Sequence, residues 1–427
     1  MILSPLPSHK PRMLPVGVLK SSGEIDSEDG ARILYCENVV HALRMVRKNG
    51  GQGIAIRSPE KYRWLRIETC GLTIYPIGTK IDLGEAILFR DYCFKKGISA
   101  RSIQGMGFYL LRQSLYGPTT LEESVTMPTK LFPSGAFTLA VPGVHSNLYQ
   151  SDIRGAYLHS LGTIHHPVTY TEVRRIAISE LAQHDAGFAL VSFRSRHPYT
   201  PKLGTKGSTV FEISPVWSTV LLSTHDLRVA LAMGTDIRLK RAWIPVGSRR
   251  VFGSFLSEMS EARKSMPIIA KLASNSVWGS FVAGSTVKRI EFRPGCSTKT
   301  YAMPPRAKLC PPLAFSVIAS LRERIIMEGI GTGTVQAHTD GILSDRPIET
   351  GDSIGDWRSS DIVSEACIVR PACYSVTVNG ETTYKVSGHS GGSERLRRMF
   401  RERIEYDTHE SSYQPPRDAR VPFGRSR

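Results

Sequence analysis

Two short apolar strands predicted in this sequence each end in an aspartate that begins a turn. One strand spans 147–151 and leads into Asp152, and the other spans 334–338 and leads into Asp340-Gly341. An aspartate at a strand end is most often a turn or capping residue. If the two strands are neighbours in one sheet, however, their ends bring two carboxylates side by side. That placement would restrict both the fold and the chemistry of the chain.

A pair of adjacent carboxylates is the smallest protein site for two divalent cations. Phosphoryl transfer between nucleotides uses two such ions about 4 Å apart, one at the attacking hydroxyl and one at the triphosphate. Asp152 and Asp340 are therefore candidate ligands of two Mg²⁺ ions, with Mn²⁺ as an alternative.

A basic helix lies between the two aspartates in the sequence. We predict one long helix over 252–278, interrupted at Pro267, in which Lys264 and Lys271 share a face. With Asn275 they form a polar stripe able to hold a triphosphate. A solvated basic helix face is the alternative interpretation. It leaves unexplained why an Asn-Ser pair and a Gly close the helix beside an aromatic residue.

The remaining pattern mixes hairpins with helices and favours an α+β fold over an alternating parallel one. The predicted strands are 62–76 (a pair), 136–141, 187–194, and a hairpin of 373–378 with 382–387 across Asn379-Gly380. The predicted helices are 38–49, 99–116, 218–233, 313–328 and a basic helix at 394–406. The tail after Pro415-Pro416 is expected to be disordered.

The net charge of +17, from 55 Lys and Arg against 38 Asp and Glu, favours a polyanionic partner. Nucleic acid is preferred over an anionic membrane, because no apolar run approaches the ~20 residues that span a bilayer. The first residues are too few and too proline-rich for a signal peptide. The seven cysteines are scattered and contain no Cys-x-x-Cys pair, which disfavours a disulfide framework and a zinc site. We expect a cytoplasmic protein, in the host cytoplasm if it is viral.

Three segments together resemble the motifs of family-B DNA polymerases, especially the protein-primed phage and plasmid enzymes. Lys271-Leu-Ala-Ser-Asn-Ser-Val-Trp-Gly279 resembles their fingers motif, Lys-x-x-x-Asn-Ser-x-Tyr-Gly. Asp152-Ile-Arg-Gly-Ala-Tyr157 is similar to the first palm motif, Asp-x-x-Ser-Leu-Tyr, and Ala337-His-Thr-Asp-Gly-Ile342 is similar to the second, Asp-Thr-Asp-Ser-Ile. The order of the motifs is also that of the family. Weaker similarities extend the resemblance over about residues 98–390, and a phage or mobile element is the source that it suggests.

The resemblance implies a role for each matching residue. Asp152 and Asp340 would bind both metal ions, with the Ile153 carbonyl as a further ligand, and Tyr157 would exclude a 2′-hydroxyl beneath the incoming sugar. The residues expected at the nucleotide are Tyr157, Arg263, Lys264, Lys271, Asn275 and Gly279. Those expected at the primer-template duplex are Arg370, Tyr374 and Lys385.

The implied protein is a template-directed DNA polymerase that adds dNTPs to a primer 3′ end. Its expected parts are a palm made of an antiparallel sheet with helices, short helical fingers and a vestigial thumb. The expected segments are an N-terminal region (1–97), the first part of the palm (98–251), the fingers (252–280), the second part of the palm (281–392), and a thumb stub with a basic tail (393–427). Primer-template DNA and dNTPs are the expected partners, with a helicase, a clamp or another replication protein as a helper.

Several positions depart from the family pattern. Gly155 replaces a Ser, Trp278 replaces a Tyr, His338 replaces the first Asp of Asp-Thr-Asp, and Ala372 replaces a Lys for which Arg370 is a substitute. Asp26-Ser-Glu28 is predicted to lie in a loop, so an intact proofreading nuclease is not expected. The short segment after Gly392 predicts low processivity. Three alternatives stay open: a primase-polymerase, a catalytically degenerate nucleic-acid-binding subunit with a polymerase fold, and a chance resemblance.

Overall fold

The computed structural model describes most of the chain between residues 127 and 386 and shorter segments before it. The described residues are 16–19, 25–27, 67–69, 72–75, 83–97, 107, 127–204, 209–249, 252–280, 286–290, 298–302, 311–331, 333–371 and 373–386. The chain divides into two compact units. Unit 1 comprises residues 1–119 and 251–311, and unit 2 comprises residues 120–250 and 312–427.

A seven-stranded antiparallel sheet forms one part of unit 2, in the order β19-β18-β17-β6-β16-β15-β5. Its strands are β5 (Thr138–Ala140), β6 (Gly143–Ile153), β15 (Thr334–His338), β16 (Gly341–Ser344), β17 (Trp357–Arg370), β18 (Cys373–Val378) and β19 (Glu381–Val386). The predicted hairpin at Asn379-Gly380 is confirmed: Val378 pairs with Glu381, and φ is 50° at Asn379 and 80° at Gly380. Two positive φ values are what a two-residue type I′ turn requires, and Asn-Gly supplies them at least cost.

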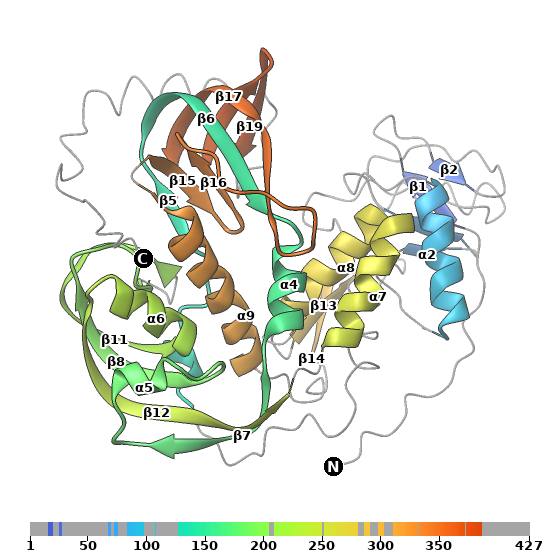
Figure 1. Ribbon diagram of the computed structural model, residues 1–427. Helices are drawn as coiled ribbons and strands as arrows, with labels where there is room; N and C mark the ends of the chain where they lie inside the picture. Colours follow the sequence, from blue (N-terminus) through green and yellow to red (C-terminus); the bar gives the residue numbers. More distant parts are fainter. Residues whose placement is uncertain are drawn as a thin grey trace. The chain divides into compact units, whose positions relative to one another are not determined.

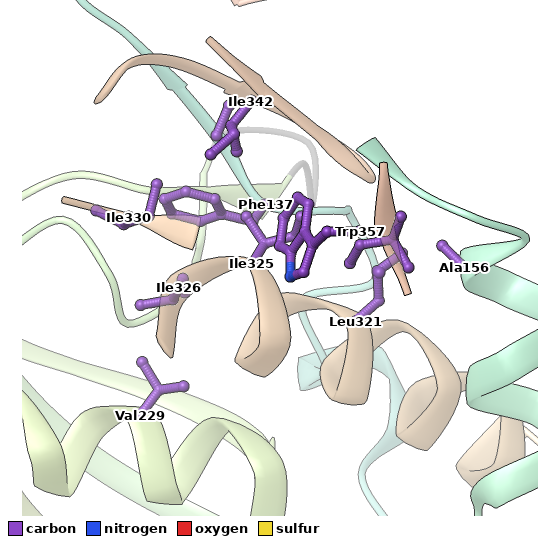
Figure 2. Packing of buried hydrophobic residues seen from close by; sticks show 11 residues of the cluster. Phe137, Ala156, Val229, Leu321, Ile325, Ile326, Ile330, Ile342 and Trp357 are labelled. Atoms are coloured by element: carbon purple, nitrogen blue, oxygen red, sulfur yellow. The ribbon is translucent and has the colours of Figure 1, made fainter. Parts of the chain in front are cut away.

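Helix α9 (Pro311–Arg324) and the π-type turn that follows it (Ile325–Gly329) cover one face of this sheet. Leu321, Ile325 and Ile326 belong to the same buried cluster as Ile342 and Trp357 of the strands (Figure 2). All five side chains are at least 95% buried, so the helix is fixed firmly beneath the strands. The predicted helix 313–328 is therefore confirmed as an element that supports the sheet.

A second antiparallel sheet in unit 2 has the order β11-β8-β12-β7. Its strands are β7 (His166–Val173), β8 (Phe188–Ser195), β11 (Ser214–Ser223) and β12 (Asp236–Arg249). Helices α5 (Ile178–Leu181) and α6 (Thr224–Ala232) contact one face. Phe315, Ile318 and Ala319 of α9 pack from the other side, so α9 is shared by both sheets (Figure 1).

The predicted helix 218–233 is wrong in its first third. Residues 218–223 belong to β11, and the helix begins only after Ser223. Ser223 and Asp226 form a reciprocal capping box, in which each side chain bonds the backbone N–H of the other residue. This cap fixes the helix start. The apolar run before it is extended because it pairs with β8 along its whole length.

Unit 1 contains a four-stranded sheet, β2-β1-β4-β3, and a group of helices. The strands are β1 (Val16–Leu19), β2 (Ile25–Ser27), β3 (Ile67–Thr69) and β4 (Leu72–Tyr75), and β1 and β4 run parallel. The strand pair predicted within 62–76 is confirmed as β3 and β4. The loop prediction for Asp26 is wrong, because Asp26 lies in β2 and pairs with Val18. The unit also holds a hairpin of β13 (Thr286–Ile290) and β14 (Thr298–Ala302).

The single interrupted helix predicted over 252–278 is two helices, α7 (Gly253–Ser265) and α8 (Pro267–Ser280). Met266 leaves the helical region with φ −133° and ψ 64°, as expected for a residue that precedes a proline. Glu85 of α2 (Leu83–Lys95) accepts a hydrogen bond from the Ile269 N–H at 2.7 Å and so caps the start of α8. Because the chain turns at Met266, the shared helix face predicted for Lys264 and Lys271 does not exist.

The strands predicted at 136–141, 147–151, 187–194, 334–338 and 373–378 with 382–387 are confirmed, apart from residue 387, which lies outside the described residues. The predicted helices 38–49 and 394–406, the tail, and all of 99–116 except Gly107 lie outside the described residues. Among the residues that the structure does describe, no helix has the length and apolar content needed to cross a bilayer.

Candidate active site

The two predicted aspartates lie side by side in the seven-stranded sheet. Asp152 is the penultimate residue of β6, and it pairs directly with Gly341, the first residue of β16. Asp340 precedes Gly341 in the turn between β15 and β16, and its carbonyl accepts a hydrogen bond from the Ile153 N–H at 2.9 Å. In an extended strand the N–H and C=O of one residue point to the same side. The Ile153 carbonyl therefore faces the Asp340 turn as well.

The turn that presents Asp340 is held in a conformation that is unusual for its sequence. Thr339 has φ 64°, and the Asp340 N–H donates to the His338 carbonyl at 2.9 Å across it. This hydrogen bond with a positive φ describes a γ-turn of the rarer, strained kind. A β-branched residue in this region costs about 1–3 kcal/mol, and such strain concentrates at functional sites. The turn places the Asp340 backbone next to β6, where the Asp340 carbonyl accepts the hydrogen bond from Ile153.

Arg358 of β17 binds the carboxylate of Asp152, which sequence reasoning missed. Its Nε donates to Oδ1 at 2.8 Å and a terminal nitrogen donates to Oδ2 at 2.9 Å. These hydrogen bonds raise the pKa of Arg358, and the charges of Asp152 and Asp340 act in the same direction. No motif marks Arg358. Its position follows from the register of β17 on β6, in which Arg358 pairs with Asp152.

Tyr157 is in the first turn of α4 (Ala156–Thr163), directly after the Asp152 strand. Its ring packs against the hydrophobic clusters of both sheets. Burial raises the pKa of its hydroxyl, and the charge of Asp340 raises it further. The phenol is therefore protonated at neutral pH and lies within electrostatic range of the Asp340 carboxylate.

Gly155 occupies a position that a serine would not adopt readily. Its φ of 56° and ψ of 39° are left-handed, and it is the N-cap residue of α4, two residues after the end of β6. Glycine tolerates this conformation without a steric penalty. The departure at Gly155 therefore has a backbone explanation in this chain.

His338, which departs from the motif Asp-Thr-Asp that its segment resembles, is a half-buried strand residue. Burial lowers the pKa of its imidazole, and the positive charge of Lys385 lowers it further. The ring is therefore neutral at neutral pH and supplies no negative charge to the site. Its Nδ1 lies 3.3 Å from the Thr339 hydroxyl.

The residues predicted at the nucleotide, Tyr157 excepted, are all in unit 1. Lys271 is exposed on α8, and Asn275 lies one turn later on the same side of the helix. Arg263 of α7 is half-buried and donates to the Ser274 hydroxyl at 3.0 Å, so it joins the two helices. Lys264 is exposed and pairs with Glu261 on its own helix. Gly279 lies in the last turn of α8.

The residues predicted at the primer-template duplex lie at the other edge of the seven-stranded sheet. Tyr374 of β18 pairs across the strands with Lys385 of β19, whose ammonium lies 5.4 Å from the centre of the tyrosine ring. Arg370 is exposed at the end of β17 and pairs with Cys373. The fold brings Tyr374 and Lys385 together on neighbouring strands.

The side chains available to a metal ion are two carboxylates. Within the part of the chain that the structure describes, no group of three or more His, Cys, Asp or Glu side chains is arranged to hold an ion. Mg²⁺ is often bound by one or two carboxylates together with substrate phosphates and water. The donor set of Asp152, Asp340 and a backbone carbonyl fits that pattern, and it does not fit a metal cage made of protein ligands alone.

The fold of the chain, with its mixed helices and antiparallel sheets, is similar to that of solved DNA polymerases. The structure is similar to that of phi29 DNA polymerase, with a TM-score of 0.58 and 13% sequence identity over 77% of this chain and 75% of the polymerase. The complex of phi29 DNA polymerase with primer-template DNA gives the same TM-score and identity over 86% of this chain and 84% of the polymerase. The complex that also contains incoming nucleotides covers 85% and 84%, respectively. No protein-family model and no curated protein matches the sequence.

Proposed function

We propose that this protein is a template-directed DNA polymerase of family B that adds dNTPs to the 3′ end of a primer. The observation that carries the proposal is the pairing of the Asp152 strand with the Asp340 turn. This pairing brings together two segments that two separate sequence motifs had identified. Similarity to a DNA polymerase over most of both chains supports the same function.

Asp152, Asp340 and the Ile153 carbonyl are the groups that would hold the metal ions. When bound, two divalent ions would activate the primer hydroxyl and neutralise the charge that develops on the triphosphate. The residues of the chain have separate tasks. Tyr157 supplies an apolar surface near Asp340 for the sugar, Lys271 and Asn275 offer donors to the phosphates, and Lys385 offers a charge to the duplex backbone.

A second candidate function is a nucleic-acid-binding subunit that has lost catalysis. Two observations favour it: His338 is a neutral ring in place of a carboxylate, and both oxygens of Asp152 are bound by Arg358. Retention of both aspartates and of Lys271 favours catalysis.

Extension of a labelled primer on a DNA template, with Mg²⁺ or Mn²⁺ and with dNTPs or NTPs, tests the proposal. Asp340→Asn is expected to lower extension more than about tenfold, which corresponds to about 1.4 kcal/mol of transition-state stabilisation. Asp345→Asn is the matched control, because Asp345 lies five residues away and is largely exposed. Duplex binding without extension would identify the degenerate subunit. Synthesis on a template without a primer would identify a primase-polymerase.

Missing proofreading and low processivity stay predictions from the sequence. The location of Asp26 in strand β2 removes one of the arguments against a nuclease. A mismatched 3′ end incubated with metal and without dNTPs should keep its full length if proofreading is missing. In the presence of excess unlabelled trap DNA, extension should stop after a few additions. Products of hundreds of nucleotides would contradict the low processivity.

A further inference from the structure

Arg358 binds both oxygen atoms with which Asp152 could ligate a divalent cation. The guanidinium binds both carboxylate oxygens in parallel, at 2.8 and 2.9 Å. This fork-to-fork geometry is the strongest type of hydrogen-bonded pair that an arginine forms with a carboxylate. The guanidinium occupies one acceptor site on each oxygen and places a positive charge against the carboxylate, and both effects would oppose the approach of a cation.

The side chain of Arg358 is positioned to move away. It is 49% exposed, whereas the Asp152 side chain is 26% exposed. Solvent screens an ion pair with this exposure and so weakens the attraction between its charges. The β17 backbone holds Arg358 in the sheet, because it pairs with β6 at this residue. The guanidinium can therefore leave the carboxylate without disturbing the sheet.

A displaced guanidinium stays close to the site, because Arg358 and Asp152 are paired residues of β17 and β6. An incoming triphosphate would bring oxygens that accept the same two parallel hydrogen bonds. The guanidinium would then exchange a carboxylate for a phosphate, while the carboxylate becomes available to metal.

We infer that Arg358 is a positioning residue for Asp152, and we call its function the guard role. It holds the carboxylate in place, opposes the binding of divalent metal to the protein alone, and yields Asp152 when a triphosphate offers replacement acceptors. The inference rests on the proposed function, because it assigns Asp152 to metal. It explains how a site with two carboxylates is coupled to the arrival of its nucleotide.

Mn²⁺ binding to the purified full chain without nucleotide or DNA tests this role directly. Free Mn²⁺ is measured by electron paramagnetic resonance for wild type, Arg358→Ala and Arg358→Lys. Arg358→Ala is expected to bind Mn²⁺ at least about tenfold more tightly than wild type, corresponding to about 1.4 kcal/mol. Arg358→Lys should lie between them, because lysine keeps the charge and loses the bidentate geometry. Addition of dNTP should tighten Mn²⁺ binding more in wild type than in Arg358→Ala.

Two further variants separate the guard role from a general charge effect. Arg194→Ala removes the same charge from another exposed Arg–Asp pair of unit 2, in which Arg194 donates to Asp236 at 2.6 Å, and should leave Mn²⁺ affinity unchanged. Adding Asp152→Asn to Arg358→Ala should abolish the gain. Thermal unfolding of each variant checks that the fold is intact.

The outcomes distinguish this inference from the proposed function. Equal Mn²⁺ affinity of wild type and Arg358→Ala would overturn the guard role, even if both proteins extend primers. An equal gain in Arg194→Ala would also overturn it, because the effect would then be one of net charge. If neither protein binds Mn²⁺ and neither extends a primer, both the guard role and the proposed function are contradicted.

Discussion

Arg322 of α9 and Asp226 of α6 form a bidentate ion pair in the interior of unit 2. The guanidinium donates to the two carboxylate oxygens at 2.9 and 2.7 Å, and both side chains are at least 98% buried. Its remaining nitrogen donates to the carbonyls of Pro133 and Gly135. Asp226 also completes the cap of α6. This buried pair thus fixes α9, which packs against both sheets, to helix α6 and to the segment that contains Pro133 and Gly135.

Truncation of this pair should destabilise unit 2 strongly. Arg322→Ala leaves a buried carboxylate and two carbonyls without their donor, and we expect a loss of about 3–5 kcal/mol in the free energy of unfolding. Urea unfolding monitored by circular dichroism measures the change. Arg194→Ala breaks an exposed pair and should cost at most about 1 kcal/mol. Similar losses in both variants would show that the Arg322 pair is not a structural anchor.

The neighbouring residue, Glu323, should make stability depend on acid pH. Its carboxylate accepts from His225 at 2.6 Å and from Arg228. Burial alone would raise the pKa of Glu323, but these hydrogen bonds and charges outweigh it and lower the pKa to about 2. A depressed pKa in the folded state contributes stability that is present above the unfolded value of about 4.5 and is lost as the pH falls towards 2.

Glu323→Gln should therefore reduce stability by about 2–3 kcal/mol at pH 6 and by much less near pH 2. Urea unfolding of wild type and variant across this pH range measures the difference. Glu212→Gln, which breaks the exposed pair with Lys202, is the control and should show little pH dependence. A constant difference between wild type and Glu323→Gln from pH 6 to pH 2 would mean that the ion pair does not cause it.

Replacement of Tyr157 separates its packing from its role at the sugar. Tyr157→Ala should cost about 3–5 kcal/mol of stability, since the ring packs against both core clusters. It should also raise incorporation of ribonucleotides relative to deoxynucleotides. Tyr157→Phe keeps the ring and should preserve the discrimination. The ratio of kcat/KM for dNTP and NTP measures it, and an unchanged ratio in Tyr157→Ala would place the discrimination elsewhere.

The strained turn at Thr339 should lower the stability of the fold while it holds Asp340 in position. Thr339→Gly relieves the positive φ, and we expect the free energy of unfolding to stay equal or rise by up to about 1 kcal/mol. Primer extension should fall at the same time, because a glycine holds the neighbouring carboxylate less firmly. Thr339→Val keeps the β-branched shape and should retain more activity. Loss of stability in Thr339→Gly without loss of activity would contradict this interpretation.

The candidate site was predictable where local sequence dictates local structure. Asn379-Gly380 determines a two-residue hairpin, and the apolar runs before Asp152 and Asp340 determine strands that end at those residues. Pro267 marks a break in the helix, although the sequence does not indicate that the chain turns there into a second helix. The apolar residues 218–223 suit a helix as well as a strand, and pairing with β8 decided the outcome.

Side-chain contacts that depend on the register of paired strands could not be predicted from local sequence. Arg358 lies far from Asp152 in the chain, and a shift of β17 by one residue would turn its side chain to the opposite face of the sheet. The Arg322–Asp226 pair likewise depends on how α9 packs against α6. The sequence by itself determined which residues carry carboxylates, where strands end and where turns form. Only the tertiary structure decided which charges meet, because strand register and helix packing set the distances over which hydrogen bonds act.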